Sequence, residues 1–141
     1  MAREPTAPEL VLECMGLGVK IRQALAVALL PYGITPEQHE LLSLLAAGKS
    51  SPRELAEASG RDKTTLSRVI ARAARAGLVE QDRRPEDRRR QVLRLTDRGS
   101  VTVDQTRRML ERSAPKLLAA LSAKEQRRLE KILRKLKSPP A

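Results

Sequence analysis

The chain has 141 residues, enough for one domain of ordinary size with a modest core. Its net charge of +11 and its pI near 10.8 favour a polyanionic partner and leave DNA, RNA and an anionic membrane open. No apolar run is long enough to cross a bilayer, and the first residues lack the hydrophobic region of a signal peptide, so we expect a soluble, cytoplasmic protein. A single cysteine excludes an internal disulfide framework.

The first predicted helix covers residues 9–30, after a short N-terminal arm that contains two prolines. Leu10, Leu17 and Ile21 recur on it at helical spacing. Gly16 and Gly18 interrupt this pattern, and they indicate either a close helix crossing or a simple local weakness.

Two shorter helices follow. Thr35 is a good N-cap with Pro36 at the first helical position, which predicts a second helix that reaches Gly48. Ser51, with Glu54 three residues later, predicts a capping box at the start of a third helix that ends at residues 59–60. This third helix is the positioning half of a helix-turn-helix, and residues 49–51 at its start are candidates for phosphate contact.

The fourth predicted helix, over residues 63–76, carries the strongest functional pattern. Asp62 is its N-cap, Gly77 stands where a left-handed C-cap is expected, and apolar residues recur along one side. Short hydroxyls let a helix approach a DNA groove, and arginines reach phosphate or the guanine edge. Hydroxyl and arginine side chains fall towards the other side of this helix, namely Thr64, Thr65, Ser67, Arg68, Arg72 and Arg75.

A basic hairpin is predicted next, because residues 78–81 and 91–95 show the alternation of half-buried strands. The loop between them, residues 82–90, contains five arginines. The predicted fold class is therefore mainly α with a small β-wing, a winged helix-turn-helix flanked by N- and C-terminal helices. In that arrangement the helix enters the major groove and the wing tip reaches the neighbouring minor groove.

The C-terminal part is predicted to be helical. Thr96 caps a helix that Pro115 either kinks, as we expect, or restarts after Ser113. Ser122 with Glu125 forms a capping box for a final helix. That helix has an apolar stripe and seven Lys and Arg residues over residues 124–137. We expect residues 1–33 and 100–141 to be dimerisation arms that flank a DNA-binding module of residues 34–99, the alternative being a monomer that folds its arms onto itself.

These motifs, in this order, resemble the MarR family of transcriptional regulators (multiple antibiotic resistance type). The matching features are residues 34–38, the Glu54-Leu55-Ala56 step, the Thr65-x-Ser67-Arg68 helix, residues 77–79 and, most specifically, the wing from Asp87-Arg88-Arg89 to Gly99. The resemblance runs without obvious gaps from about residue 30 to residue 99. Two departures are Ala73, where a large aliphatic residue is usual, and His39, where an aromatic residue is common.

The resemblance implies a homodimeric regulator that binds a palindromic operator, and we expect this chain to act as a repressor. It implies that Arg89 enters the minor groove and that Asp87 holds the wing arginines in place. It also implies a small anionic or phenolic effector that binds between the dimer arms and the DNA-binding module, for which Arg22, Tyr32 and His39 are candidates.

For double-stranded DNA we expect the wing arginines to supply most of the affinity through phosphate contacts, and Lys63, Thr64, Thr65 and Arg68 to supply most of the sequence preference. Replacing Arg89 by alanine should weaken operator binding and leave the fold intact. The expected contact residues are Ser51, Lys63, Thr64, Thr65, Ser67, Arg68, Arg72, Arg83, Arg84, Arg88, Arg89 and Arg90.

Other chemistry finds little support. Cys14 raises the possibility of peroxide sensing, which one branch of the family performs, but the family's sensing position aligns with Val11, so a buried apolar cysteine is the simpler interpretation. His39 with Glu37, Glu40 or Cys14 is too small a set for a transition-metal site, so we expect a partly buried, hydrogen-bonded histidine. We expect no cofactor and no enzyme activity, since no phosphate loop or nucleophile motif is present.

Two other functions remain open. The charge alone allows a small basic RNA- or ribosome-binding protein, although the chain lacks the aromatic stacking platforms that such proteins commonly display. A nonspecific architectural DNA-binding protein would bind duplex without a preferred operator.

Overall fold

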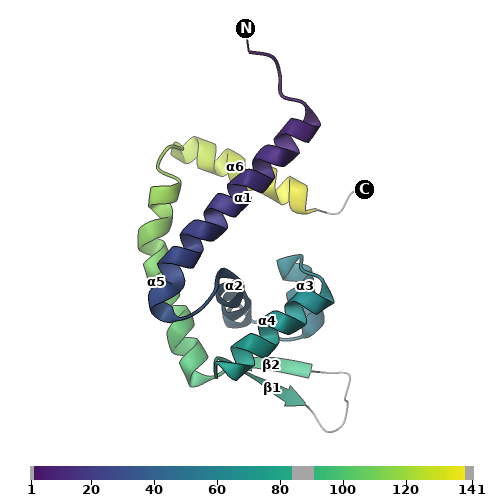
Figure 1. The fold of residues 1–141 in the computed structure, drawn as a ribbon, viewed down its shortest axis with the longest axis vertical. Coiled ribbons are helices and arrows are strands. Elements are labelled where there is room, and N and C mark those ends of the chain that lie inside the picture. The colour runs from purple at the N-terminus through teal and green to yellow at the C-terminus, as the bar shows by residue number, and fades with distance from the viewer. Residues whose placement is uncertain (1, 84–90, 139–141) are drawn as a thin grey trace. The chain divides into compact units, whose positions relative to one another are not determined.

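The computed structural model describes residues 2–83 and 91–138 (Figure 1). The chain divides into two compact units, residues 1–106 and residues 107–141. The expected functional division at residues 33 and 99 stays a prediction. No helix in the described ranges is both long enough and apolar enough to span a membrane.

The first unit begins with helix α1 (Ala7–Leu29), followed by a short 3₁₀ turn, η1 (Leu30–Tyr32). Thr6 and Glu9 form a capping box at the start of α1, a signal that the sequence analysis missed. The helix passes through Gly16 and Gly18 without a break. A Cβ atom at either glycine would meet no other atom within 4 Å, so neither marks a close crossing within this chain.

The core of the first unit lies between helices α2 (Pro36–Ala46), α3 (Pro52–Ser59) and α4 (Lys63–Arg75) and the hairpin beside them (Figure 1). The predicted caps are confirmed for two of these helices: Thr35 accepts a hydrogen bond from the backbone of Gln38, and Asp62 accepts one from the backbone of Thr65. Most of the fully buried side chains are aliphatic, with Leu42 and Leu55 at 0% exposure, and Thr106 is a polar exception. Burial of such side chains is the main source of stability here.

The hairpin pairs β1 (Val79–Arg83) with β2 (Gln91–Leu95) in antiparallel register, with Val79 opposite Leu95. Strand β2 is also joined to the segment before α3, because the backbone N–H of Leu93 donates to the carbonyl of Ser50 over 2.8 Å. This bond ties the wing to the positioning helix.

Helix α5 (Asp97–Leu117) begins directly after the wing and crosses from the first unit into the second. Its predicted cap is confirmed: the hydroxyl of Thr96 accepts from the backbone N–H of Gly99 and donates to the carbonyl of Gly77 over 2.6 Å. The helix continues through Pro115 and ends two residues later, so it is not broken and restarted at Ser113.

The second unit contains the end of α5 and helix α6 (Ala123–Lys137). The predicted capping box of Ser122 and Glu125 is present at the start of α6. Leu129, Ile132, Leu133 and Leu136 recur along one side of α6, as expected, and the last three are exposed in this chain.

Candidate nucleic-acid interface

The N-cap of helix α4 is Asp62, whose carboxylate places a negative charge beside the first turn. The backbone hydrogen bond from Thr65, with an N–O distance of 2.7 Å, lowers the pKa of Asp62 below its ordinary value. Asp62 is therefore ionised at neutral pH and stabilises the N-terminus of α4. The next two residues, Lys63 and Thr64, are exposed.

The faces of α4 follow the predicted pattern closely. Leu66, Ile70 and Ala73 are buried, so the small side chain of Ala73 fills its position in the core despite the usual large aliphatic residue of the family. Thr65 is only half-exposed. The exposed polar and charged side chains of this helix are Lys63, Thr64, Ser67, Arg68, Arg72 and Arg75.

A groove of about 1080 Å³ separates α3, α4 and the base of the wing. Leu66 and Ile70 contribute its apolar floor, and Lys63 and Ser67 of α4 line its edge. Sequence reasoning missed Arg53 and Glu57 of α3, which line the same groove and form an exposed ion pair at 3.4 Å. Their i,i+4 spacing on a short helix could have predicted the ion pair, but not their place in the groove.

The start of α3 differs in one detail from the predicted capping box. The hydroxyl of Ser51 accepts from the backbone N–H of Glu54, as expected, but it also donates to the carboxylate of Glu54 over 3.1 Å. The prediction of a reciprocal capping box is therefore wrong for α3, because the carboxylate of Glu54 accepts from the hydroxyl of Ser51 instead of its backbone N–H. Ser51 lies in the groove wall and is half-exposed.

Charged side chains on the two wing strands lie close to side chains of opposite charge. Arg94 on β2 lies 3.8 Å from Glu80 and 3.5 Å from Asp82 on β1, so its charge is offset by two carboxylates. Arg83 ends β1 opposite Gln91, but its side chain is not described. The predicted roles of Arg84, Asp87, Arg88, Arg89 and Arg90 fall outside the described residues.

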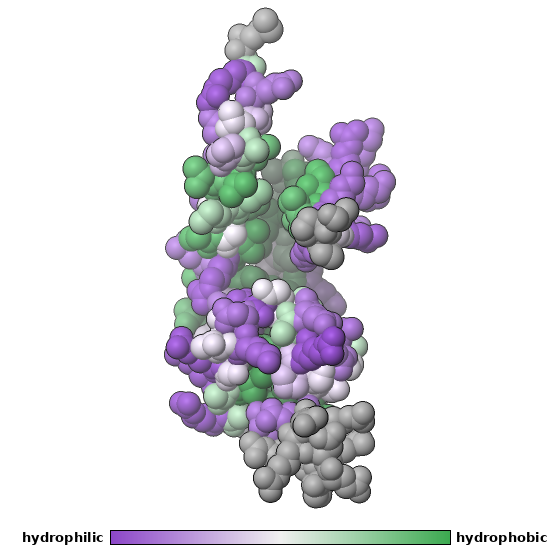
Figure 2. Space-filling model, turned by 90° about the vertical axis from the view of Figure 1, so that its right-hand side faces the viewer, coloured by the Kyte–Doolittle hydropathy of each residue, from purple (hydrophilic) through white to green (hydrophobic). Residues whose placement is uncertain are grey.

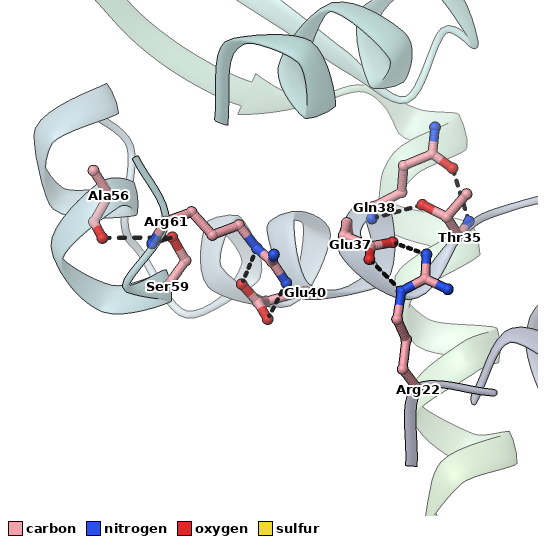
Figure 3. A network of polar contacts seen from close by, with 8 residues as sticks. All are labelled: Arg22, Thr35, Glu37, Gln38, Glu40, Ala56, Ser59 and Arg61. Atoms are coloured by element: carbon pink, nitrogen blue, oxygen red, sulfur yellow. Dashed lines mark hydrogen bonds and ion pairs between the residues drawn. The ribbon is translucent and has the colours of Figure 1, made fainter. Parts of the chain in front are cut away.

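Helix α2 holds two arginines from neighbouring segments (Figure 3). Arg22 of α1 binds both carboxylate oxygens of Glu37, at 2.6 and 2.9 Å. Arg61, in the turn before α4, binds both oxygens of Glu40, at 3.2 and 3.4 Å. The hydrogen bond from Arg22 lowers the pKa of Glu37, which keeps this pair ionised at neutral pH.

The three candidate effector residues all lie in the described part of the chain, but none of them lines the groove beside α4. The guanidinium of Arg22 already has an anionic partner in Glu37. Tyr32 is half-buried in η1. His39 is half-buried and hydrogen-bonded, as the sequence analysis expected: its Nδ1 lies 3.0 Å from the hydroxyl of Thr106, which itself donates to the carbonyl of Val103. The other ring nitrogen, Nε2, lies 3.4 Å from the hydroxyl of Ser43.

Cys14 is exposed on α1, so the expectation of a buried cysteine is wrong for the single chain. The physical reason is that the N-terminal half of α1 carries its apolar side chains at the surface, as Figure 2 shows in green along this helix. Within the described residues, no cluster of three or more His, Cys, Asp or Glu side chains is suited to a metal ion.

A helix-turn-helix whose second helix has a buried apolar side and an exposed hydroxyl-and-arginine side, followed by a two-stranded wing, defines the winged helix-turn-helix class. A model of the MarR family matches residues 32–90. This match, the HTH-type relatives and the similar solved structures support a MarR family winged-helix regulator, in agreement with the resemblance seen in the sequence. MarR proteins are transcription regulators rather than enzymes, in agreement with the sequence analysis.

Individual relatives support the same assignment. The chain is 32% identical over 107 residues to YdgJ of Bacillus subtilis (strain 168), named as an uncharacterized HTH-type transcriptional regulator. That match covers 75% of this chain and 65% of YdgJ, so the chain spans just under two thirds of that relative's length.

Two solved structures share the fold over nearly the whole chain. A mutant MarR of E. coli complexed with operator DNA is 27% identical, with a TM-score of 0.82, and the match covers 92% of this chain and 94% of that one. The PcaV transcriptional regulator of Streptomyces coelicolor, in complex with its natural ligand, is 28% identical with a TM-score of 0.76, and the match covers 96% of each chain.

Proposed function

We propose that this chain is a transcription regulator that binds double-stranded DNA at a specific operator. The observation that carries the proposal is the exposed side of α4, where hydroxyl and arginine side chains stand on a helix with a buried apolar back. The similar MarR structure is a complex with operator DNA, which supports the same role for α4. A role in transcription implies a cytoplasmic location.

The exposed residues divide by the contacts that their chemistry allows. Lys63, Thr64 and Arg68, with the half-exposed Thr65, read base edges in the major groove. Ser51, Ser67 and Arg72 contact the phosphates on either side, and the wing arginines add phosphate and minor-groove contacts. Phosphate contacts position the protein and base contacts supply its specificity.

The active species is a homodimer that binds a palindrome. Helix α1 exposes apolar side chains on opposite faces, such as Leu17 at 57% and Val19 at 57%, and a helix that is apolar on opposite faces requires partners on both. Two copies related by a two-fold axis present two recognition helices to successive major grooves.

The regulator is a repressor that releases its operator when a small anionic or phenolic ligand binds. The similar PcaV structure contains that protein's natural ligand, which supports a ligand-responsive role here. In this chain Glu37 already binds Nε and Nη2 of Arg22, so an anion either displaces Glu37 or binds the remaining N–H donors of the guanidinium. Such a ligand acts only if it favours the dimer geometry that DNA does not fit.

The test is selection of a preferred duplex from a random pool, followed by binding measurements on that duplex, on random duplex and on RNA. We expect one palindrome to be preferred, and the Arg68→Ala variant to bind it about 10- to 100-fold more weakly, because a bidentate base contact contributes roughly 1–3 kcal/mol. Arg3→Ala is the matched control, since it removes the same charge from a residue that pairs with Glu9 outside α4.

Each alternative has its own outcome. Preference for RNA over every duplex would replace the proposal with an RNA-binding role. Equal affinity for all duplexes would indicate an architectural DNA-binding protein.

A further inference from the structure

The positive charge of this chain is concentrated outside the helix-turn-helix and the wing. Residues 107–141 hold eleven Lys and Arg residues against three Asp and Glu residues, a net charge of +8 out of the total of +11. Residues 1–106 hold seventeen against fourteen, a net charge of only +3. Operator binding by α4 and the wing therefore leaves most of the charge excess without a role.

Much of this charge lies on one face of α6. At the helical period, six cations fall within an arc of about 120°, and the apolar stripe occupies the other side of the helix. No acidic residue of α6 falls within that arc. We call it the α6 basic face; it consists of Lys124, Arg127, Arg128, Lys131, Arg134 and Lys135, all of them exposed.

The carboxylates of α6 are already engaged and offset little of this charge. Glu125 accepts from the backbone N–H of Ser122 over 3.0 Å in the capping box. Glu130 pairs with Arg134 at 2.5 Å, at the edge of the face. A partner that covers the apolar stripe of α6 would leave the basic face in water, since burying six unpaired cations is costly.

We propose that the α6 basic face is a second DNA-binding surface, which contacts the phosphate backbone of duplex DNA without regard to sequence. Charge complementarity carries this proposal: a row of long, flexible cations fits a regular array of phosphates, and the face contains none of the hydroxyl side chains that α4 offers. The chain contains no Phe or Trp, which disfavours anchoring in a membrane interface or stacking on single-stranded nucleic acid.

This surface goes beyond the operator contact made by α4. It raises the affinity of the protein for any duplex, so it helps the protein to remain on DNA while it searches for a site, or to hold a second DNA segment. Sequence preference stays with α4 and is not affected.

The test uses the full chain and random-sequence duplex, with affinity measured between about 50 and 200 mM salt. The first variant carries Arg127→Gln, Arg128→Gln, Lys131→Gln and Lys135→Gln, which keeps the Arg134–Glu130 pair and the helix propensity of α6. We expect the slope of log affinity against log salt to fall by about three to four, and the affinity at low salt to fall roughly 100-fold.

The matched control keeps the charge at the same four positions, as Arg127→Lys, Arg128→Lys, Lys131→Arg and Lys135→Arg. It should bind random duplex like the unaltered chain. A variant with only Arg127→Gln and Lys131→Gln should show about half the change in salt slope. Circular dichroism and sedimentation must show unchanged helix content and assembly in all variants.

The outcomes separate this inference from the proposed function. If the glutamine variant keeps its preference for the selected palindrome but loses affinity for random duplex, both stand. If the unaltered chain prefers no duplex and the glutamine variant still loses affinity, the operator proposal fails and the α6 proposal stands. Unchanged salt slopes would overturn the α6 proposal, as would a variant that loses binding to anionic lipid vesicles while its DNA binding is unaltered.

Discussion

At the residue scale, Gly99 packs closely against the junction between α4 and the wing. A Cβ atom at this position would lie 2.0 Å from the backbone carbonyl oxygen of Leu78 and 3.3 Å from the side chain of Leu95. The same carbonyl accepts the backbone N–H of Thr96 over 3.1 Å, so it cannot move freely. Gly99 is therefore required by close packing, and its role is to let α5 start tightly against the wing.

We predict that Gly99→Ala destabilises the protein by about 3 kcal/mol or more, because backbone rather than a flexible side chain must shift. Chemical denaturation followed by circular dichroism measures this loss. Gly16→Ala is the matched control: its Cβ meets nothing within 4 Å, so we expect a gain of up to about 1 kcal/mol from helix propensity. Equal effects of the two substitutions would contradict the packing argument.

His39 is the single histidine of the chain, which makes its titration separable. Burial lowers its pKa below the ordinary value of 6.5, and the nearby carboxylate of Glu40 opposes the shift only in part. The unfolded chain therefore binds this proton more tightly than the folded chain does. The contribution of His39 to stability is complete above the unfolded pKa and is lost as the pH falls through 6.5 towards the folded value.

We predict that the denaturation midpoint falls as the pH is lowered from about 8 to 5, and that His39→Asn removes this part of the pH dependence. Asparagine keeps a polar group that can hydrogen-bond to the hydroxyl of Thr106, but it does not titrate. The difference between the two proteins isolates His39 from the carboxylates, which titrate at lower pH. Parallel midpoint curves for both proteins over this range would show that His39 is not the responsible group.

At the element scale, helix starts were predictable because their signals are local. The caps at Thr35, Asp62 and Ser122 each depend on residues three apart. The start of α1 was predicted two residues late, because the prolines near it suggested an unstructured arm. Pro8 lies in the first turn of the helix, where no backbone donor is needed, so it is compatible with the Thr6 cap.

Contacts between elements were not predictable from sequence. The Arg22–Glu37 and Arg61–Glu40 pairs join residues that are 15 and 21 positions apart, and nothing local indicates them. The pattern of α4 was sufficient to separate buried from exposed residues, since a single helical period decides that question. The groove lining by Arg53 and Glu57 depends on how α3 packs beside α4, so the pattern of one helix could not reveal it.

The two ion pairs of α2 position its neighbours more than they stabilise the fold. The side chain of Arg22 is 55% exposed and that of Glu40 is 40% exposed, and solvent screens ion pairs in such settings, so each contributes little to stability. Their bidentate geometry nevertheless fixes direction, because both oxygens of each carboxylate are used. Helix α2 thereby connects α1 to the turn that starts α4 (Figure 3).

At the scale of the whole molecule, α1 leaves apolar side chains exposed on opposite faces in a single chain. Leu12, Met15 and Val19 lie on one face, Leu10 and Leu17 lie on the opposite face, and all five are at least half exposed. A soluble monomer rarely leaves so much contiguous apolar surface uncovered. The proposed dimer accounts for this surface, and it also accounts for Cys14, which a partner subunit would cover.

We predict that the protein sediments at twice the chain mass of 15.6 kDa. Leu17 and Val19 lie on opposite faces of α1, so the double variant Leu17→Glu and Val19→Glu places a charge on whichever face the partner covers. This variant should shift the protein to the monomer, because a buried unpaired carboxylate costs several kcal/mol. Gln23→Glu is the control, since it adds a charge to the same helix without removing an apolar contact, and it should remain dimeric.

Monomer formation should also weaken binding to the selected palindrome more than binding to one half-site, because only the dimer presents two recognition helices. A native chain that sediments as a monomer, or a double variant that stays dimeric, would contradict the two-fold arrangement of α1.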